Sequence, residues 1–420
     1  MINEQNSKLK KIKSCATKFG TPLYIVDEDE LTKNARNLVN LFKKRLHNVE
    51  IFYPYKTNNL PLVCERFKEM NLGAEVSSIL DLKLAIRLGV EKIIFNSPAK
   101  KSDEICEIIE NDNVTFVADN IQQLRLVNEN SKNHDIGVRI KLSNTDKKWE
   151  RFGIEPKQFL ENYKKCTKNR IVGMHFHCFT KNKNPETYSR LLTHIRNLIL
   201  KLDEKTRKNI KFVDIGGGFD SGGYFTLNPI EFASRLTGNK LLPIRSIQYS
   251  MFKKTDMKSL AKNISESFEE KILNIKGLEN TSLYLEPGRL LVNNFIHVLS
   301  SVLYVDKKFV TIDAGTNIFP RILYEHHPII NLSSLSENVI KTNIFGSLCS
   351  STDIIGNFVF TNSLNISDIL MVMNIGAYSI SQAQQFIEPL PKVISLKNGN
   401  AKTVRVEEDF EYRYKRDVGD

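Results

Sequence analysis

Residues 51–56 read Ile-Phe-Tyr-Pro-Tyr-Lys, a run of aromatic and branched side chains that ends at a charged one. A run of this kind is typical of a buried strand. Similar runs recur along the chain, and each is followed by a stretch with helical periodicity. Eight strands alternating with helices predict an α/β fold, a parallel (β/α)8 barrel of the TIM type. The predicted strands are 51–55, 74–77, 93–96, 115–118, 137–142, 172–177, 212–215 and 282–285.

The carboxyl ends of these strands are where such a barrel places its chemistry. The sequence has polar, charged or glycine residues at each of these ends. The excursion from Asp220 to about Met257 is the longest between two strands, and we expect it on the substrate side. The strand-end residues are Lys56, Glu75, Asn96, Asp119, Arg139, His177, Gly216, Gly217, Gly218, Glu286 and Arg289.

The residues outside the barrel predict a second domain. A helix begins at Asp27 to Glu30, and one more strand precedes it at 22–26. After Arg289 the pattern changes to short strands with few long helical stretches, as at 309–312, 354–360 and 369–372. We therefore predict a barrel over 28–295 and a β-rich domain built from 1–27 and 296–420.

The charge of the chain does not indicate a nucleic-acid partner. Lys and Arg number 60 against 48 Asp and Glu, which gives a net charge of +12. These residues are spread through helical segments among acids, without the interleaved aromatics that stack on bases. Solvated helix faces explain them better, and we expect no nucleic-acid partner.

Composition also bounds the location and the redox chemistry. The apolar stretch 295–305 is too short for a membrane span and is interrupted by polar residues, so we expect no membrane partner. The lysine-rich first 14 residues have no apolar core of a secretory signal, which makes a cytoplasmic location the expectation. The six cysteines form no CxxC pair and are read as reduced thiols.

Several short motifs, in order, resemble the fold-type III pyridoxal-phosphate-dependent decarboxylases. This group acts on ornithine, arginine and diaminopimelate and has the alanine-racemase-like fold, and the diaminopimelate branch is nearest in wording. The matching motifs cover nearly the whole chain. They are 19–24 (FGTPLY), 53–58 (YPYKTN), 73–77 (GAEVS), 173–177 (GMHFH), 214–218 (DIGGG), 286–289 (EPGR), 313–315 (DAG) and 376–378 (GAY).

The resemblance implies pyridoxal 5'-phosphate as cofactor and assigns residues to it. Lys56 would form the Schiff base, and we expect its apolar and aromatic setting to lower its pKa by desolvation. Glu286 would keep the pyridine nitrogen protonated and stabilise a quinonoid, although a salt bridge to Arg289 is the alternative for that carboxylate. His177 would stack on the ring. Further cofactor residues are Glu75, Arg139, Thr180, Gly216, Gly217, Gly218, Gly288, Arg289 and Tyr378.

Two of these assignments have their own alternatives. Glu75 stands where relatives usually carry aspartate, so the cofactor or His177 must shift slightly to accommodate one more methylene. His175 and His177 lie two apart on one strand and point to the same face, which is a possible metal pair. No third ligand is evident in the sequence, and we predict no metal site.

The resemblance also implies a homodimer with shared active sites. Cys349, within Gly346 to Asp353, matches a cysteine that relatives insert into the partner subunit's site to return a proton to Cα. An ordinary buried thiol is the alternative. Together the catalytic residues implied are Lys56, Cys349, His177 and Glu286.

The substrate side departs from the relatives. After the cysteine they carry a glutamate or aspartate that recognises a distal ammonium, whereas this chain has Ser350. The arginine expected four residues before Tyr324 is displaced, because Pro320 occupies that position and Arg321 follows. A buried ammonium without a carboxylate is unfavourable, so the substrate's far end should differ. The residues predicted on this side are Asp313, Arg321, Tyr324, Ser350 and Asp353.

The sequence thus predicts a decarboxylase, a carboxy-lyase that acts on an amino-acid-type substrate. A conjugated or carrier-tethered amino acid from a specialised pathway fits the loss of the acidic residue. Two alternatives stay open. One is a racemase or epimerase on the same fold, which would need a base on the opposite ring face. The other is a non-catalytic cofactor-binding regulatory protein, although its smaller relatives lack a β domain.

Overall fold

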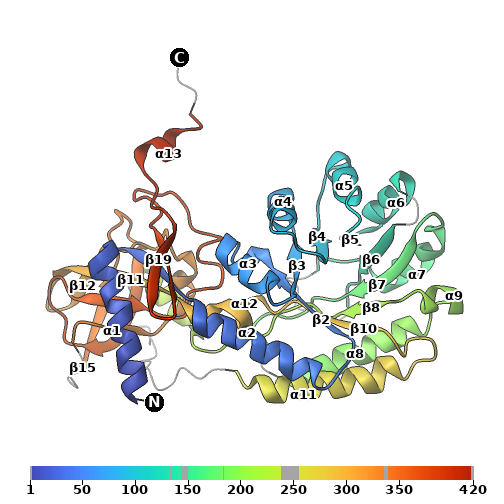
Figure 1. The fold of residues 1–420 in the computed structure, drawn as a ribbon, viewed down its shortest axis with the longest axis horizontal. Helices are drawn as coiled ribbons and strands as arrows, with labels where there is room; N and C mark the ends of the chain where they lie inside the picture. The colour runs from blue at the N-terminus through green and yellow to red at the C-terminus, as the bar shows by residue number, and fades with distance from the viewer. Residues whose placement is uncertain are drawn as a thin grey trace. The chain divides into compact units, whose positions relative to one another are not determined.

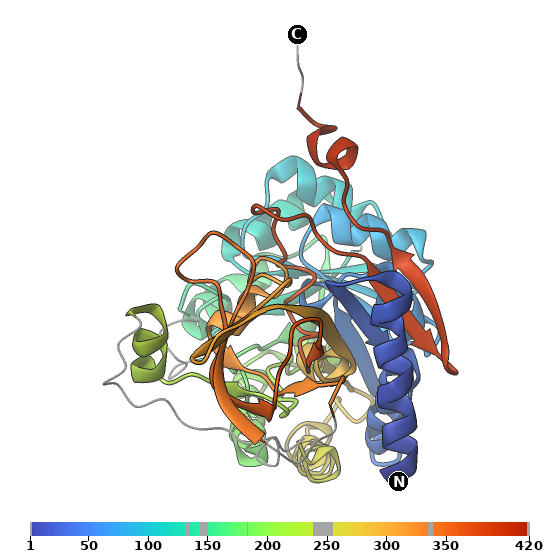
Figure 2. The ribbon, with the colours of Figure 1, turned by 90° about the vertical axis from the view of Figure 1, so that its left-hand side faces the viewer.

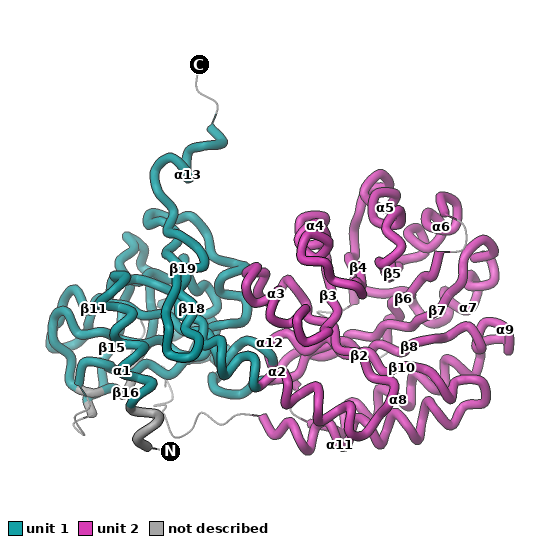
Figure 3. Tube along the Cα trace, in the orientation of Figure 1, with its two compact units in different colours: residues 1–33, 221–254, 291–420 teal, residues 34–220, 255–290 magenta. Residues whose placement is uncertain are grey.

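The computed structural model describes residues 2–131, 134–142, 150–182, 184–237, 255–334 and 339–417. Contacts divide the chain into two compact units, coloured separately in Figure 3. Unit 1 comprises 1–33, 221–254 and 291–420, and unit 2 comprises 34–220 and 255–290. Within the described ranges, no helix is both long and apolar enough to cross a membrane.

Unit 2 contains a closed barrel of parallel strands, which confirms the predicted fold. The strand order around the barrel is β10-β2-β3-β4-β5-β6-β7-β8. Each predicted strand appears within a few residues of its expected bounds. The strands are β2 (Val49–Pro54), β3 (Gly73–Val76), β4 (Ile93–Asn96), β5 (Val114–Ala118), β6 (Asp135–Arg139), β7 (Arg170–His175), β8 (Phe212–Asp214) and β10 (Ser282–Leu285).

Helices alternate with these strands and surround them (Figure 1). Their apolar faces turn inward, as on α8, where Tyr188, Leu191 and Leu192 are buried. The helices are α2 (Glu28–Lys43), α3 (Pro61–Lys68), α4 (Ile79–Arg87), α5 (Ser102–Ile109), α6 (Ile121–Asn130), α7 (Pro156–Asn162), α8 (Pro185–Ile199), α9 (Glu204–Lys208), α11 (Met257–Phe268) and α12 (Gly288–Val292).

The amino-terminal end of the barrel interior is filled by aromatic rings. Tyr284 lies between two other rings: it stacks on Phe212 with a centroid distance of 4.4 Å and meets Phe52 at 4.7 Å in a tilted arrangement. Glycines on neighbouring strands leave the space for them, since a Cβ on Gly173 would lie 1.9 Å from the Phe212 ring. Large and small side chains therefore alternate around the barrel, which makes it a packed core rather than a pore.

Unit 1 is built on a 9-stranded sheet, and β1 (Leu23–Asp27) lies inside it. As predicted, this N-terminal strand joins the C-terminal ones, pairing antiparallel with β11 and parallel with β18. The other strands are β11 (Ile296–Val305), β12 (Phe309–Ile312), β14 (Ile329–Asn331), β15 (Val339–Phe345), β16 (Ile354–Asn362), β17 (Ile369–Val372), β18 (Val393–Lys397) and β19 (Asn400–Arg405).

The first helix, α1 (Ile2–Phe19), lies against this sheet (Figure 2). Its Ile12, Cys15 and Ala16 are buried in one cluster with Ile25 and Ile394. The chain ends in a short helix, α13 (Phe410–Tyr414), after β19.

Unit 1 also takes up the start of the long excursion. Asn294 and Asn374 donate hydrogen bonds to the carbonyls of Ser221 and Gly223, at 3.2 and 2.8 Å. These bonds attach the excursion to unit 1 rather than to the barrel, whereas the sequence grouped it with 28–295. Residues 238–254 lie outside the described residues, and the predicted domain boundaries stay a prediction.

Candidate active site

The carboxyl ends of the barrel strands bring the predicted residues of unit 2 together. Lys56 follows β2 in a 3₁₀ turn, η1 (Tyr55–Thr57), and Glu75 lies on the neighbouring β3. The Lys56 ammonium pairs with a Glu75 oxygen at 2.5 Å. The Lys56 side chain is 42% exposed in this chain, and the expected lowering of its pKa stays a prediction. A carboxylate and solvent surround this amine, because β2 ends before the lysine and leaves it on the rim.

Glu286 lies with two histidines at this mouth. Its carboxylate is 3.3 Å from His175 Nε2 and 3.8 Å from His177 Nδ1. Burial lowers the pKa of both imidazoles, that of His177 to about 4, so both are neutral at neutral pH. Burial alone would raise the pKa of Glu286, but the histidines and the Lys56 ammonium outweigh it and hold that pKa well below its usual value.

Two more buried carboxyl groups surround this charge. Burial, opposed by Lys56 and reinforced by Glu286, raises the pKa of Glu75 to about 7. Burial and the same Glu286 charge raise the pKa of Asp214 well above its usual value. The mouth therefore keeps one firmly ionised carboxylate, Glu286, beside two that hold their protons more tightly.

The glycine triplet after β8 forms a close backbone junction. Gly216 and Gly218 have positive φ values of 67° and 78°. A Cβ on Gly217 would lie 2.2 Å from the Glu286 carbonyl oxygen, so a side chain there is excluded. Asp214 accepts the N–H of Gly216 at 2.7 Å and His177 that of Gly217 at 3.3 Å.

Those two bonds leave one amide of the triplet for a ligand. The N–H of Gly218 makes no hydrogen bond within the described residues. Thr180 is adjacent to Gly218, because its backbone nitrogen lies 3.4 Å from the position that a Gly218 Cβ would occupy. The threonine is exposed. An anion could use this amide and hydroxyl.

The loop that carries Glu286 is packed against the loop that carries Lys56. A Cβ on Gly288 would lie 2.1 Å from the Thr57 hydroxyl oxygen, which explains why residue 288 is glycine. Arg289 follows in the first turn of α12 and is buried. Arg139 is buried as well and pairs with Asp119 at 3.1 Å, next to the histidine pair whose pKa values its charge lowers.

The remaining predicted residues belong to unit 1. Arg321 lies in the 3₁₀ helix η7 (Pro320–Leu323). Its guanidinium carbon is 5.7 Å from the centre of the Tyr324 ring and 5.6 Å from that of Tyr378. Tyr378 has a positive φ of 64°, a strained conformation for a tyrosine. The displaced arginine thus still meets Tyr324, because residues three apart eclipse in a 3₁₀ helix.

Cys349 is exposed at the tip of a turn that Asp353 organises. The buried Asp353 carboxylate accepts the N–H of Thr316 at 2.7 Å and that of Leu348 at 2.8 Å. Ser350 contacts Thr352 through the hydroxyl groups, at 3.0 Å. Both Asp353 oxygens are therefore engaged in shaping the turn, and its role in substrate binding stays a prediction.

Asp313 is also engaged within unit 1. Its oxygens accept hydrogen bonds from the Thr21 and Ser300 hydroxyls, both at 2.6 Å, and from the Ser301 N–H at 3.0 Å. These bonds give it a structural task in joining β1, β11 and β12. Its predicted contact with a substrate cation is not tested by this geometry.

Sequence reasoning missed two contributors and a possible ligand set. Asp214, at the end of β8, fixes the first glycine of the triplet. His175, read only as one half of a metal pair, is fully buried against Glu286. The ligand atoms of His175, His177 and Glu286 lie within 4.8 Å of one another, so Glu286 is the third potential metal ligand that the spacing alone did not reveal.

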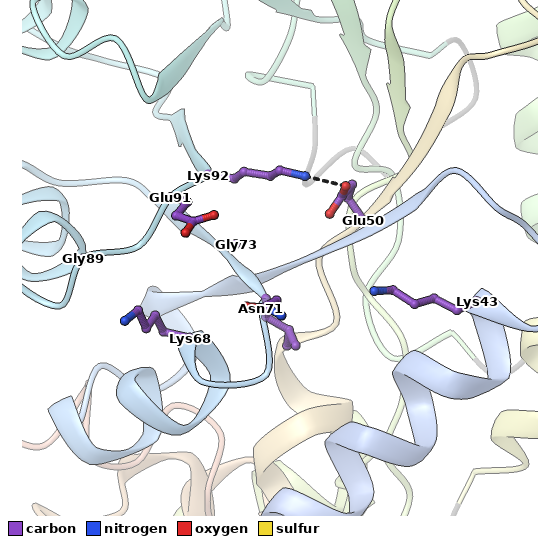
Figure 4. A pocket seen from close by; sticks show the side chains of 9 residues that line it. Lys43, Glu50, Lys68, Asn71, Gly73, Gly89, Glu91 and Lys92 are labelled. Carbon is purple, nitrogen blue, oxygen red and sulfur yellow. Dashed lines mark hydrogen bonds and ion pairs between the residues drawn. The ribbon is translucent and has the colours of Figure 1, made fainter.

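The barrel has a pocket of about 200 Å³ at the amino-terminal ends of its strands (Figure 4). Lys43, Lys68 and Glu91 line it, and Lys92 reaches across to Glu50 at 2.5 Å. Its residues lie at the beginnings of β2, β3 and β4 or just before them. Because barrel chemistry belongs to the carboxyl ends of strands, this pocket is not the candidate site.

Comparisons with known proteins agree with the geometry. The family described as "Pyridoxal-dependent decarboxylase, pyridoxal binding domain" matches residues 32–293. A diaminopimelate decarboxylase of Methanothermobacter thermautotrophicus is 25% identical, with 94% of this chain and 91% of that protein covered. An L-glutamyl-(BtrI acyl-carrier protein) decarboxylase of Niallia circulans is 23% identical, with coverages of 94% and 93%.

Solved structures show the same fold. The diaminopimelate decarboxylase of M. jannaschii superposes with a TM-score of 0.83 at 24% identity, covering 97% of this chain and 94% of that chain. A lysine/ornithine decarboxylase of Vibrio vulnificus, solved with putrescine, gives a TM-score of 0.76 at 20% identity, with coverages of 94% and 99%.

Proposed function

This chain belongs to the pyridoxal-dependent decarboxylase family, and we propose that it removes the α-carboxylate of an amino acid whose far end carries no free ammonium. Its cofactor is pyridoxal phosphate, and its activity is that of an amino-acid decarboxylase. A conjugated or carrier-tethered amino acid is the substrate class that we favour. The observation that carries this choice is the turn around Ser350, in which the residue after Cys349 carries a hydroxyl and not a carboxylate.

The residues of unit 2 fit the cofactor. Glu286 is buried, keeps its charge and has His175 Nε2 3.3 Å from its Oε1, and a protonated ring nitrogen would be a further charge partner for this carboxylate. The Gly218 amide, Thr180 and Arg289 suit a phosphate group. When bound, pyridoxal phosphate supplies an electron sink for the electrons that Cα receives as carbon dioxide leaves.

The protein residues then have separate tasks. Lys56 would hold the cofactor covalently, and in the cofactor-free chain Glu75 pairs with its ammonium. Neutral His177 suits a flat ring contact, because an uncharged imidazole can pack against an aromatic face without a desolvation penalty. Glu286 keeps its negative charge at neutral pH, as a partner of a protonated ring nitrogen must. Cys349, contributed by the partner subunit of a homodimer, returns a proton to Cα.

The same donor set could ligate a metal. His175, His177 and Glu286 offer three converging atoms. The family membership and the glycine junction at Gly217 favour the organic cofactor for this position.

The substrate class follows from the Cys349 turn. Ser350 offers a hydroxyl where an ammonium would need a carboxylate, and both oxygens of Asp353 already accept backbone N–H groups. An ammonium brought to Ser350 would lose water without gaining a carboxylate partner at that residue, which is unfavourable by roughly several kcal/mol. The similarity to a decarboxylase named for a glutamyl carrier-protein substrate points in the same direction. The similarity to diaminopimelate decarboxylases makes free diaminopimelate the second candidate.

The test is a panel measured by carbon dioxide release. It contains meso-diaminopimelate, L-lysine, L-ornithine, L-arginine and the L-glutamyl thioester of pantetheine. We expect the thioester to be turned over and the free amino acids with a distal ammonium to be turned over poorly. Efficient turnover of free meso-diaminopimelate, with none of the thioester, would contradict the proposal.

Substitution of Ser350 sharpens this test. Ser350→Glu should raise kcat/KM for meso-diaminopimelate by about tenfold or more, because it restores a charge partner for the ammonium. Ser350→Gln is the matched control, with the same length and no charge, and should give no such gain. Equal effects of both variants would show that charge at residue 350 does not select the substrate.

A further inference from the structure

The beginning of the long excursion is packed onto the turn that carries Arg321. It forms β9 (Phe225–Thr226) and α10 (Pro229–Thr237), and both belong to unit 1. Strand β9 pairs with β13 (Glu325–His326), directly after that turn. Between β9 and α10, the Leu227 N–H donates to the Tyr324 carbonyl at 2.9 Å. On α10, the Phe232 ring stacks on the Tyr324 ring at 5.3 Å and 20°.

A buried arginine on α10 makes the most extensive of these contacts. Arg235 is 1% exposed. Its guanidinium donates to the Ile322 carbonyl through a short bond and to the Glu325 carbonyl at 3.4 Å. A second nitrogen lies 3.1 Å from His326 Nδ1. The two carbonyls flank Tyr324 in the sequence, so one planar group fixes the backbone on both sides of this residue.

Arg235 remains a cation in this setting. Burial lowers its pKa to about 10, and the buried Glu231, one turn earlier on α10, opposes the shift. Burying a full charge to bind backbone carbonyls is costly, and an apolar side chain of similar volume would fill the same space without that cost. The Arg235 guanidinium donates several hydrogen bonds in a fixed planar arrangement, and these bonds fix the backbone over 322–325, which an apolar side chain cannot do.

That backbone geometry determines where Arg321 lies. Residues 320–323 form the 3₁₀ helix η7, in which residues three apart eclipse. In this winding Arg321 meets the Tyr324 ring, and the Glu325 carboxylate lies 3.6 Å from the Arg321 guanidinium.

We propose that Arg235 is a positioning residue for substrate recognition, which holds η7 so that Arg321 and Tyr324 present one ordered surface to an anionic or carbonyl-bearing far end of the substrate. The excursion thereby becomes a specificity element of this chain. This inference rests on the proposed function, because it takes Arg321 and Tyr324 as the substrate side. It adds a residue that touches neither cofactor nor substrate.

The experiment compares Arg235→Met, Arg235→Lys and the natural chain as full-length holoenzymes. The probes are meso-diaminopimelate and the L-glutamyl thioester of pantetheine. For the probe that the natural enzyme uses better, we expect Arg235→Met to raise KM at least tenfold while kcat changes less than threefold. Arg235→Lys should recover part of the loss, because an ammonium can still reach one carbonyl. The visible absorbance of the bound cofactor should be the same in all three proteins.

Two further variants keep the test decisive. Phe232→Leu removes the ring on Tyr324 without leaving a buried charge, and it should raise KM in the same direction even if Arg235→Met fails to fold. Arg87→Met, an exposed arginine on the barrel helix α4, is the matched control and should change nothing. Unchanged KM in both Arg235→Lys and Phe232→Leu would overturn the proposal.

A separate readout distinguishes this proposal from the proposed function. Hydrogen exchange of the 321–327 amides should become faster in Arg235→Lys and Phe232→Leu than in the natural chain, with or without substrate. If neither probe is turned over but exchange rises, the substrate class is wrong and the positioning role stands. If exchange is unchanged in these variants, the positioning role is wrong whatever the substrate.

Discussion

Lys56 and Glu75 form an ion pair at the barrel mouth, and the lysine is more exposed than its apolar and aromatic neighbours in the sequence suggest. The sequence identified both residues from motif and position, and the structure places them 2.5 Å apart. It could not reveal that the lysine is partly solvated, because exposure depends on where β2 ends and η1 begins. Asp313 and Asp353 show the same limit. The sequence shows that both residues are aspartates, but the hydrogen-bond donors that engage them come from distant segments of unit 1.

The raised pKa of Glu75 predicts a pH dependence of stability in the cofactor-free protein. The folded state holds this proton up to about pH 7, whereas an ordinary glutamate releases it near 4.5. Between these values the folded state binds more protons than the unfolded state, so the free energy of unfolding falls as pH rises from about 4.5 to 7. Urea unfolding of Glu75→Gln at several pH values should show a weaker slope in this window.

A matched variant makes the comparison interpretable. Glu129→Gln removes an exposed carboxylate and should keep the slope of the natural chain. An identical slope in Glu75→Gln and the natural chain would show that the buried proton does not reside on Glu75.

At the scale of elements, short sequence features determine where strands, turns and glycine loops form. The eight strands were predictable because each is an apolar run of suitable length between helical patterns. The winding of η7 was not, since a 3₁₀ and an α turn differ by one residue in register and Pro320 is compatible with either. The glycines at 216–218 were predicted as cofactor residues, but two of their amides have intramolecular partners that only the assembled strand ends supply.

Glycine 173 allows the barrel interior to close around Phe212. A Cβ there would lie 1.9 Å from the ring, so Gly173→Ala must displace the phenyl group or the strand. Overpacking of this kind typically costs about 1–3 kcal/mol, and a shift of the urea midpoint would report it. Adding Phe212→Leu should restore part of the stability, because the smaller side chain makes room. Equal stability of Gly173→Ala and the natural chain would mean that the aromatic layer is not tightly packed.

At the scale of the whole molecule, the sequence predicted a barrel and a β-rich unit with strands from both ends of the chain. The pairing of β1 with β11 and β18 confirms this arrangement. The attachment of the excursion to unit 1 was not predictable, because Arg235 and its carbonyl partners are about 90 residues apart. Only the folded chain brings such segments together.

The proposed homodimer with shared sites predicts complementation between two inactive variants. Lys56→Ala lacks the cofactor lysine and Cys349→Ala lacks the proton donor, and each should be nearly inactive alone. If subunits exchange at random, half of the dimers are mixed and each contains one intact site, which gives about a quarter of the natural activity. Should the mixture remain inactive after verified subunit exchange, Lys56 and Cys349 act within the same chain or Cys349 has another role.

The central claim is that Lys56 in the barrel of this chain carries pyridoxal phosphate. Reduction of the holoenzyme with borohydride makes the attachment permanent, and mass spectrometry of the digested protein then locates the modified lysine. We predict a single phosphopyridoxyl group on the peptide that contains Lys56, and none in the Lys56→Ala protein treated in the same way. A modification on a different lysine, or an unmodified Lys56 in an enzyme that still releases carbon dioxide, would contradict the account.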